Sequence, residues 1–165
     1  MDREKLKNIF TKIGEVNPEY TLDKQLYNNG ELIQFIDNPS EEMKQVVMVQ
    51  EDPYLIRYID NPSEKVQLAV VEKNPYLFQF IENPTEKVQL AVIEQDPYSF
   101  YYIENPSEKV QLAAVKENPY SIQYIQNPSE KVQLAAVEKD PLSIKRIQNP
   151  TEAVKQFPLS KGFNI

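Results

Sequence analysis

The sequence predicts an all-α fold, an α-solenoid built from two-helix repeats of 22 residues. Two series of prolines support this prediction. An Asn-Pro dipeptide recurs every 22 residues, with its proline at Pro62, Pro84, Pro106, Pro128 and Pro150. A second series, in which the proline follows Asp or Asn, has the same spacing, at Pro53, Pro75, Pro97, Pro119 and Pro141. Repeats of about this length are typical of solenoids, in which each repeat buries its apolar faces only against its neighbours.

The chain divides into four segments of what we expect to be one domain. Residues 1–16 are predicted to form an N-terminal capping helix, because apolar residues recur at helical spacing and Gly14 stands where a helix would end. Residues 17–37 form a degenerate repeat, and residues 38–148 form five regular repeats. Residues 149–165 are a truncated repeat with a tail, in which Pro158 is expected to end the last helix.

Each repeat contains two signals for the start of a helix. We expect Asn61 to be the N-cap of the longer helix, with Pro62 at its first position and Glu64 at its third, as in a capping box. The shorter helix begins at Pro75 after Asn74. Because each Asn/Asp-Pro pair ends one helix and begins the next, the turns need little glycine. This explains why the chain has 13 prolines but only 3 glycines.

Apolar residues lie on two sides of the longer helix. At 100° per residue, Val66, Ala69 and Val70 share one side, and Leu68 and Val71 share nearly the opposite one. A helix that is apolar on two sides is sandwiched between neighbours. The shorter helix has an inward face made by Leu77, Phe78 and Ile81. Stacked repeats would therefore form one continuous core.

The repeat also resembles a known family. Its pattern is Asn-Pro-x-x-x-Val-x-x-Ala-Val/Ala-x-x-x-Asn/Asp-Pro followed by a short apolar helix, over roughly residues 17–156. This is similar to the leucine-rich-repeat-variant group of HEAT-like α-solenoids, whose unit is slightly longer. The resemblance implies a right-handed superhelix of alternating long and very short helices. It also implies a binding scaffold without catalytic residues.

The composition excludes several classes of protein. Without histidine or cysteine the chain has no Ser-His or Cys-His pair, no imidazole or thiolate metal ligand and no disulfide. We therefore expect no catalytic, cofactor-binding or metal-binding residues and no enzyme. No apolar run reaches the roughly 18 residues of a membrane helix, and no signal peptide is recognised, so a cytoplasmic protein without membrane contact is expected. The net charge of −7 argues against direct binding of nucleic acid.

Two rows of tyrosines are the first candidate for a partner-binding surface. Tyr54, Tyr76, Tyr98 and Tyr120 follow the prolines of the short helices, and Tyr58, Tyr102 and Tyr124 come four residues later, with Tyr101 as an additional ring. At i,i+4 spacing each pair would lie on one flank of its helix. Tyrosine is enriched at protein interfaces because it combines a large apolar area with a polar tip. The alternative is that these rings pack between adjacent repeats.

An acidic edge is the second candidate. Asp37, Asp60, Glu82 and Glu104 occupy one equivalent position of successive repeats, and glutamine replaces them later in the chain. Such an edge fits a basic partner protein, because complementary charge steers the encounter. The alternative is a solvated edge that keeps a repeat protein soluble. A row of glutamines on the longer helices, which includes Gln67 and Gln133, is expected to bind the neighbouring turns.

The sequence favours a non-enzymatic protein-binding scaffold that uses the tyrosine strip and the acidic edge. The alternative function is an acidic inhibitor of a nucleic-acid-handling protein, of the phage anti-defence or anti-CRISPR type, acting as a partial DNA mimic. The charge density is low for mimicry, because DNA carries one charge per roughly 1.7 Å of its axis. The partner, the biological process and the oligomeric state do not follow from the sequence.

Overall fold

The computed structural model describes residue 33 and residues 38–162 of the chain. The predicted capping helix, most of the degenerate repeat, Asp37 and the last three residues of the tail lie outside these described residues. The chain divides into two compact units, Met1–Asn83 and Pro84–Ile165, and each unit is described by itself.

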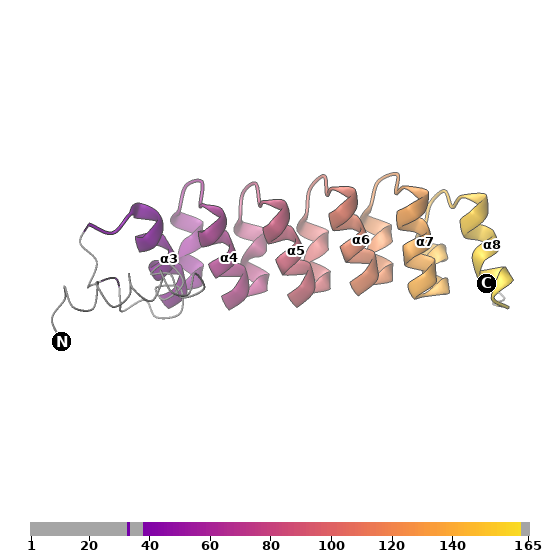
Figure 1. Ribbon diagram of the computed structural model, residues 1–165, viewed down its shortest axis with the longest axis horizontal. Coiled ribbons are helices and arrows are strands. Elements are labelled where there is room, and N and C mark those ends of the chain that lie inside the picture. The colour runs from indigo at the N-terminus through magenta and orange to yellow at the C-terminus, as the bar shows by residue number, and fades with distance from the viewer. Residues whose placement is uncertain (1–32, 34–37, 163–165) are drawn as a thin grey trace, which may run out of the picture. The chain divides into compact units, whose positions relative to one another are not determined.

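The described part is all-helical and alternates α-helices with short 3₁₀-helices, as predicted (Figure 1). Unit 1 contains α3 (Glu41–Glu51), η3 (Pro53–Tyr58), α4 (Glu64–Lys73) and η4 (Pro75–Phe80). Unit 2 contains α5 (Glu86–Gln95), η5 (Pro97–Tyr102), α6 (Glu108–Glu117), η6 (Pro119–Tyr124), α7 (Glu130–Lys139), η7 (Pro141–Arg146) and α8 (Glu152–Ser160). The residues that the structure describes include no strand.

Repeats pack on their neighbours in chain order within each unit. In unit 1, α3 contacts α4 and η3 contacts η4. In unit 2, α5 to α8 lie side by side in sequence (Figure 1), and η5, η6 and η7 contact one another in the same order. In a solenoid each repeat packs only on its neighbours in this way. The predicted α-solenoid of 22-residue two-helix repeats is therefore confirmed.

The longer helices begin two residues later than the sequence predicted. The N-cap of α4 is Ser63, whose hydroxyl accepts a hydrogen bond from the Val66 amide at 3.5 Å, and not Asn61. Asn61 has a φ of 48° and so cannot start a right-handed helix. Asparagine tolerates the left-handed conformation better than other residues with a side chain. The turn therefore places asparagine where many proteins place glycine.

The shorter helices are 3₁₀-helices of six residues. In η4 the Asn74 side chain accepts from the Tyr76 amide at 3.1 Å, which confirms Asn74 as the N-cap and Pro75 as the first residue. The Ile81 amide then donates to the Phe78 carbonyl at 2.9 Å and closes the end of the helix. A 3₁₀-helix has three residues per turn, so residues i and i+3 eclipse.

Most of the predicted core positions are buried, and Leu68 is half-buried. Val66, Val70 and Val71 are fully buried on α4, and Leu77, Phe78 and Ile81 form the buried face of the short helix. Each fully buried aliphatic or aromatic side chain contributes about 1.5–3 kcal/mol. The longer helices are apolar on two sides because both sides pack on neighbouring elements.

The last helix differs from its prediction. Pro158 does not end α8, which continues to Ser160, and the proline is buried inside it. Proline removes one backbone hydrogen bond of a helix. In α8 this loss falls in the final turns, where few bonds depend on it.

Candidate functional site

Most of the predicted tyrosine strip lies on the surface. Exposed rings in unit 1 are Tyr54, Tyr58 and Tyr76, and exposed rings in unit 2 are Tyr98, Tyr101, Tyr102 and Tyr124. Between 50% and 82% of each of these residues is accessible to solvent. The alternative interpretation, packing between adjacent repeats, applies to Tyr120, which is half-buried.

The winding of the short helices changes which tyrosines share a face. In a 3₁₀-helix Tyr98 lies in line with Tyr101, three residues later, and not with Tyr102. Phe100 and Ile103 form the buried line of the same element. The i,i+4 pairing expected from α-helical geometry is therefore replaced by i,i+3 pairing, which moves Tyr101 into the centre of the aromatic surface.

Three tyrosines of unit 2 form a contiguous cluster. The Tyr101 ring makes an edge-to-face contact with Tyr102 at a centroid distance of 5.3 Å, and a second one with Tyr124 at 5.3 Å. Tyr124 belongs to η6, so the second contact joins two repeats. Edge-to-face pairs at this distance are favourable because the positive ring edge meets the negative ring face. We call Tyr101, Tyr102 and Tyr124 the tyrosine cluster.

The equivalent surface of unit 1 contains a cation. The guanidinium carbon of Arg57 lies 3.9 Å from the centroid of the Phe80 ring and 5.5 Å from that of Tyr54. Both distances are within the roughly 6 Å of a cation–π interaction. This contact was not predicted, although the arginine at a position that holds glutamine or tyrosine in the next three repeats could have indicated it.

Tyr120 has a structural role. Its hydroxyl donates a hydrogen bond to Oδ2 of Asp140 at 2.7 Å, across 20 residues of sequence. This hydrogen bond raises the pKa of Tyr120, because the ionised phenolate could not donate to the carboxylate. Tyr120 is therefore the one predicted strip residue among those described that is tied to a neighbouring repeat by its polar tip.

The acidic edge is exposed where the structure describes it. Asp60, Glu82 and Glu104 are all exposed, and each directly precedes the asparagine of a turn. Glu104 and Tyr124 line the same open cleft of about 640 Å³, together with Gln111 and Gln126. The structure thus brings one member of the acidic edge next to the tyrosine cluster.

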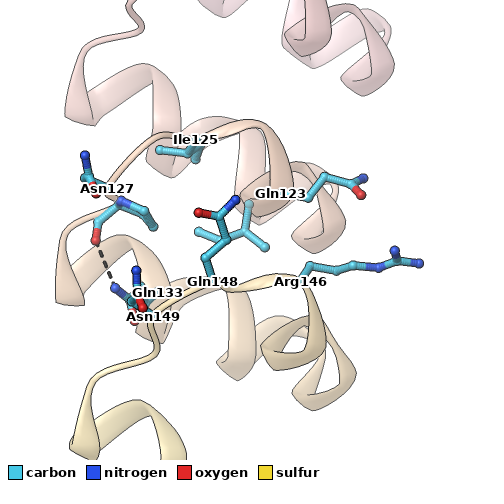
Figure 2. A pocket seen from close by; sticks show the side chains of 9 residues that line it. Gln123, Ile125, Asn127, Gln133, Arg146, Gln148 and Asn149 are labelled. Atoms are coloured by element: carbon cyan, nitrogen blue, oxygen red, sulfur yellow. Dashed lines mark hydrogen bonds between the residues drawn. The ribbon is translucent and has the colours of Figure 1, made fainter.

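An equivalent cleft one repeat later has a polar lining. Its volume is about 180 Å³, and Gln123, Asn127, Gln133, Arg146, Gln148 and Asn149 line it. Figure 2 shows Gln123 and Arg146 pointing to the same side, away from Asn127 and Asn149. Arg146 stands here where Tyr124 stands in the preceding repeat, so the aromatic surface ends at this position.

The glutamine row has the structural role that the sequence favoured. The Nε2 atom of Gln133 donates to the Pro128 carbonyl at 3.0 Å (Figure 2). Its Oε1 atom accepts from the Thr151 amide at 3.1 Å. Three other glutamines donate in the same way to the proline carbonyl five residues earlier: Gln67, Gln89 and Gln111. These glutamines hold the turns and are not placed to read a ligand.

A ladder of glutamate contacts was not predicted. The Glu86 carboxylate accepts from the Ser107 hydroxyl at 2.6 Å and from Lys109 Nζ at 2.9 Å. Glu108 is bound in the same way by Ser129 at 2.6 Å and by Lys131 at 3.6 Å. The pKa of each carboxyl is lowered, mainly by the serine hydrogen bond. The repeated Ser-Glu-Lys triplet was the available signal.

Some lysines near the C-terminal end of the described residues take part in ion pairs or ring contacts. Lys131 pairs with Glu108, and Lys155 pairs with Glu152 at 2.6 Å. Lys161 lies 5.9 Å from the ring centroid of Phe157. Lys145 and Arg146 are exposed at the end of η7. Lys145 and Arg146 are therefore adjacent to the end of the aromatic surface.

The chain matches no protein-family model, no curated protein and no solved structure. The family resemblance therefore rests on the repeat pattern, and the structure shows the repeated long and short helices of that pattern. Within the described residues, no helix combines the length and apolarity needed to span a membrane. The same part of the chain holds no group of three acidic side chains arranged to bind a metal ion.

Proposed function

We propose that the protein is a non-enzymatic scaffold that binds a partner protein through the surface around the tyrosine cluster. The observation that carries this proposal is the edge-to-face contact of Tyr101 with Tyr124, which joins exposed rings from two repeats. Monomeric proteins rarely expose contiguous apolar patches without a functional reason. The resemblance to HEAT-like solenoids supports the same function, since it implies a binding scaffold.

The short helices are a suitable support for such a surface. Each is closed at its start by an Asp or Asn side chain and at its end by an isoleucine amide, so the tyrosines project from short, well-anchored elements. Rigid aromatic side chains lose little conformational entropy on binding. Glu104 adds a charge at the rim of the same surface, where it can orient a basic partner.

The test is an affinity purification from cells of the source organism with two matched baits. One bait carries Tyr101→Ser, Tyr102→Ser and Tyr124→Ser, and the control bait carries Leu159→Ser, at an exposed position of α8 outside the cluster. A protein captured by the wild type and by the control, but not by the cluster variant, is then purified. Its affinity for the cluster variant should fall by about 30-fold or more, the effect of losing one interface hot spot.

Circular dichroism and the urea midpoint must be unchanged in the cluster variant. If a captured protein binds the cluster variant as tightly as the wild type, the proposal is wrong. A second bait set, Asp60→Asn, Glu82→Gln and Glu104→Gln, tests the alternative function of an acidic inhibitor. A nucleic-acid-handling protein lost only with this second set would favour that alternative.

A further inference from the structure

Two equivalent surfaces of the repeat, 44 residues apart, differ in whether they contain an arginine. In unit 1, Arg57 covers the Phe80 ring at 3.9 Å and approaches the Tyr54 ring at 5.5 Å. Two repeats later, the positions of Tyr54 and Phe80 hold Tyr98 and Tyr124, while the position of Arg57 holds Tyr101. The surface in unit 2 thus keeps the aromatic rings and lacks the arginine.

The rings of unit 2 are open to a cation from outside the chain. Tyr98 is 78% exposed and Tyr101 is 64% exposed. Among the described residues, no lysine or arginine lies over the rings of Tyr98, Tyr101, Tyr102 or Tyr124, whereas Arg57 and Lys161 do lie over rings elsewhere. The face of an aromatic ring attracts cations through its quadrupole.

A carboxylate lies in the cleft that the Tyr124 ring lines. Glu104 lines the cleft of about 640 Å³ that Tyr124 also lines, and it is exposed. It makes no ion pair with any residue that the structure describes. A guanidinium group stacks on aromatic faces and also presents two N–H groups to a carboxylate in a fixed fork. The two features therefore suit one and the same ligand group.

We propose that the surface formed by the tyrosine cluster, Tyr98 and Glu104 binds an arginine side chain of the partner protein. This inference rests on the proposed function and specifies the chemistry of the partner's contact residue. Arginine fits better than lysine, because a planar guanidinium can stack on an aromatic ring and donate two hydrogen bonds to a carboxylate at the same time. An ammonium group cannot do both. The net charge of −7 favours a basic partner segment in general.

Arg146 marks the end of this site. It occupies the position that Tyr124 has in the preceding repeat, and it points to the same side as Gln123 (Figure 2). An arginine of the partner would be repelled near Arg146 and attracted near Glu104. The bound guanidinium is therefore expected at the cleft that Tyr124 and Glu104 line together.

The first test uses the full chain with ring-labelled tyrosine and a short acetylated, amidated peptide that contains two arginines between glycines. Nuclear magnetic resonance should show shifts for Tyr101, Tyr102 and Tyr124. The same peptide with citrulline, which has the shape of arginine without its charge, should bind at least about fivefold more weakly. Equal affinity for the two peptides, or no shifts up to about 10 mM peptide, would overturn the inference.

The second test exchanges the two surfaces. Tyr101→Arg supplies an internal guanidinium, as Arg57 does in unit 1, and should abolish the arginine-specific shifts. Arg57→Gln uncovers the rings of Tyr54 and Phe80, and should create a second site at which the Tyr54 signals move. Both variants must keep the circular dichroism of the wild type. A folded Arg57→Gln protein that gains no site contradicts the cation–π basis of the inference.

The two proposals can fail separately. If the cellular partner depends on the tyrosine cluster but the arginine and citrulline peptides bind alike, the scaffold function stands and the arginine inference is wrong. If the arginine peptide binds specifically but no captured protein depends on the cluster, the proposed function is wrong, and with it the assignment of the arginine to a partner.

Discussion

The hydroxyl of Tyr120 donates a hydrogen bond to the Oδ2 atom of Asp140, 2.7 Å away in the next repeat. The other oxygen of that carboxylate, Oδ1, accepts from the Leu142 amide at 2.9 Å and caps η7. The Asp140 side chain thus caps the start of η7 and also binds Tyr120 of η6. Tyr98 occupies the equivalent position one repeat earlier, and it is exposed. The residue 20 positions after Tyr98 is Asn118, whereas the residue 20 positions after Tyr120 is Asp140.

This contact predicts different effects for two identical substitutions. Tyr120→Phe should lower the free energy of unfolding, because it removes a hydrogen bond to a charged acceptor and leaves the ring in place. Tyr98→Phe should leave it unchanged. Urea denaturation followed by circular dichroism measures both. Identical midpoints for the two variants would show that the hydrogen bond adds nothing to stability.

The same contact predicts a pH effect on Tyr120. Its pKa is raised above the usual value of 10.0 by the hydrogen bond to Asp140. A raised pKa in the folded state means that the contact stabilises the fold below pH 10 and that this contribution is lost as the pH rises through the folded value. Absorbance titration of the wild type should show one phenol that ionises later than the others. In the Asp140→Asn variant, which keeps an oxygen for the cap, that late phenol should be absent.

Two buried serines in unit 2 predict opposite changes in the free energy of unfolding when each is replaced by alanine. The Ser143 hydroxyl is completely buried and has no hydrogen-bond partner among the described residues, whereas the Ser99 hydroxyl donates to Asp96 at 2.7 Å. Ser143→Ala should raise the free energy of unfolding by about 1–3 kcal/mol, since it removes an unsatisfied polar group. Ser99→Ala should lower it by about 0.5–1.5 kcal/mol.

Thermal or urea denaturation of the two serine variants decides this point. The contrast between them controls for the general effect of replacing serine by alanine at a buried position of a short helix. A loss of stability in Ser143→Ala equal to that in Ser99→Ala would mean that the Ser143 hydroxyl is satisfied in solution.

The repeat architecture could be predicted from the sequence because its signals are local and recur. Proline spacing fixes the period, and the apolar positions identify buried residues such as Val66 and Phe78. The exact helix start could not be predicted, because Asn61 and Ser63 are both good N-caps and only backbone geometry places Asn61 in the left-handed region. Contacts between side chains of different repeats, such as Tyr101 with Tyr124, depend on 3₁₀ winding that the apolar pattern does not distinguish from α-helical winding.

The glutamate ladder predicts a loss of stability in acid. The pKa of Glu86 is lowered by the Ser107 hydrogen bond and then by Lys109. A carboxyl whose folded pKa is below its unfolded pKa stabilises the fold above the unfolded value, and this contribution disappears as the pH falls through the folded value. The free energy of unfolding should therefore decrease below about pH 4.5, the usual value for glutamate.

Two variants separate this ladder from general acid effects. Glu86→Gln should show a weaker decrease of stability between neutral and acid pH than the wild type. Glu138→Gln changes an exposed glutamate of α7 that makes no ion pair with a described residue, and should follow the wild-type profile. The measurement is urea denaturation at a series of pH values. Parallel profiles for Glu86→Gln and the wild type would show that the ladder does not control the acid response.

The left-handed asparagines give the last prediction. Asn105 has a φ of 48°, and the turn that it forms is held by the Gln111 side chain, which donates to the Pro106 carbonyl at 2.9 Å. Asn105→Ala should lower the free energy of unfolding by at most about 1–2 kcal/mol, because alanine lacks the polar side chain with which asparagine compensates for the crowding of its β-carbon in this conformation. Asn105→Gly should be tolerated, since glycine adopts positive φ without strain. Urea denaturation of both variants tests the backbone conformation directly. If alanine is tolerated as well as glycine, asparagine is not required at this position for its left-handed conformation, and the scarcity of glycine in the repeats has another cause.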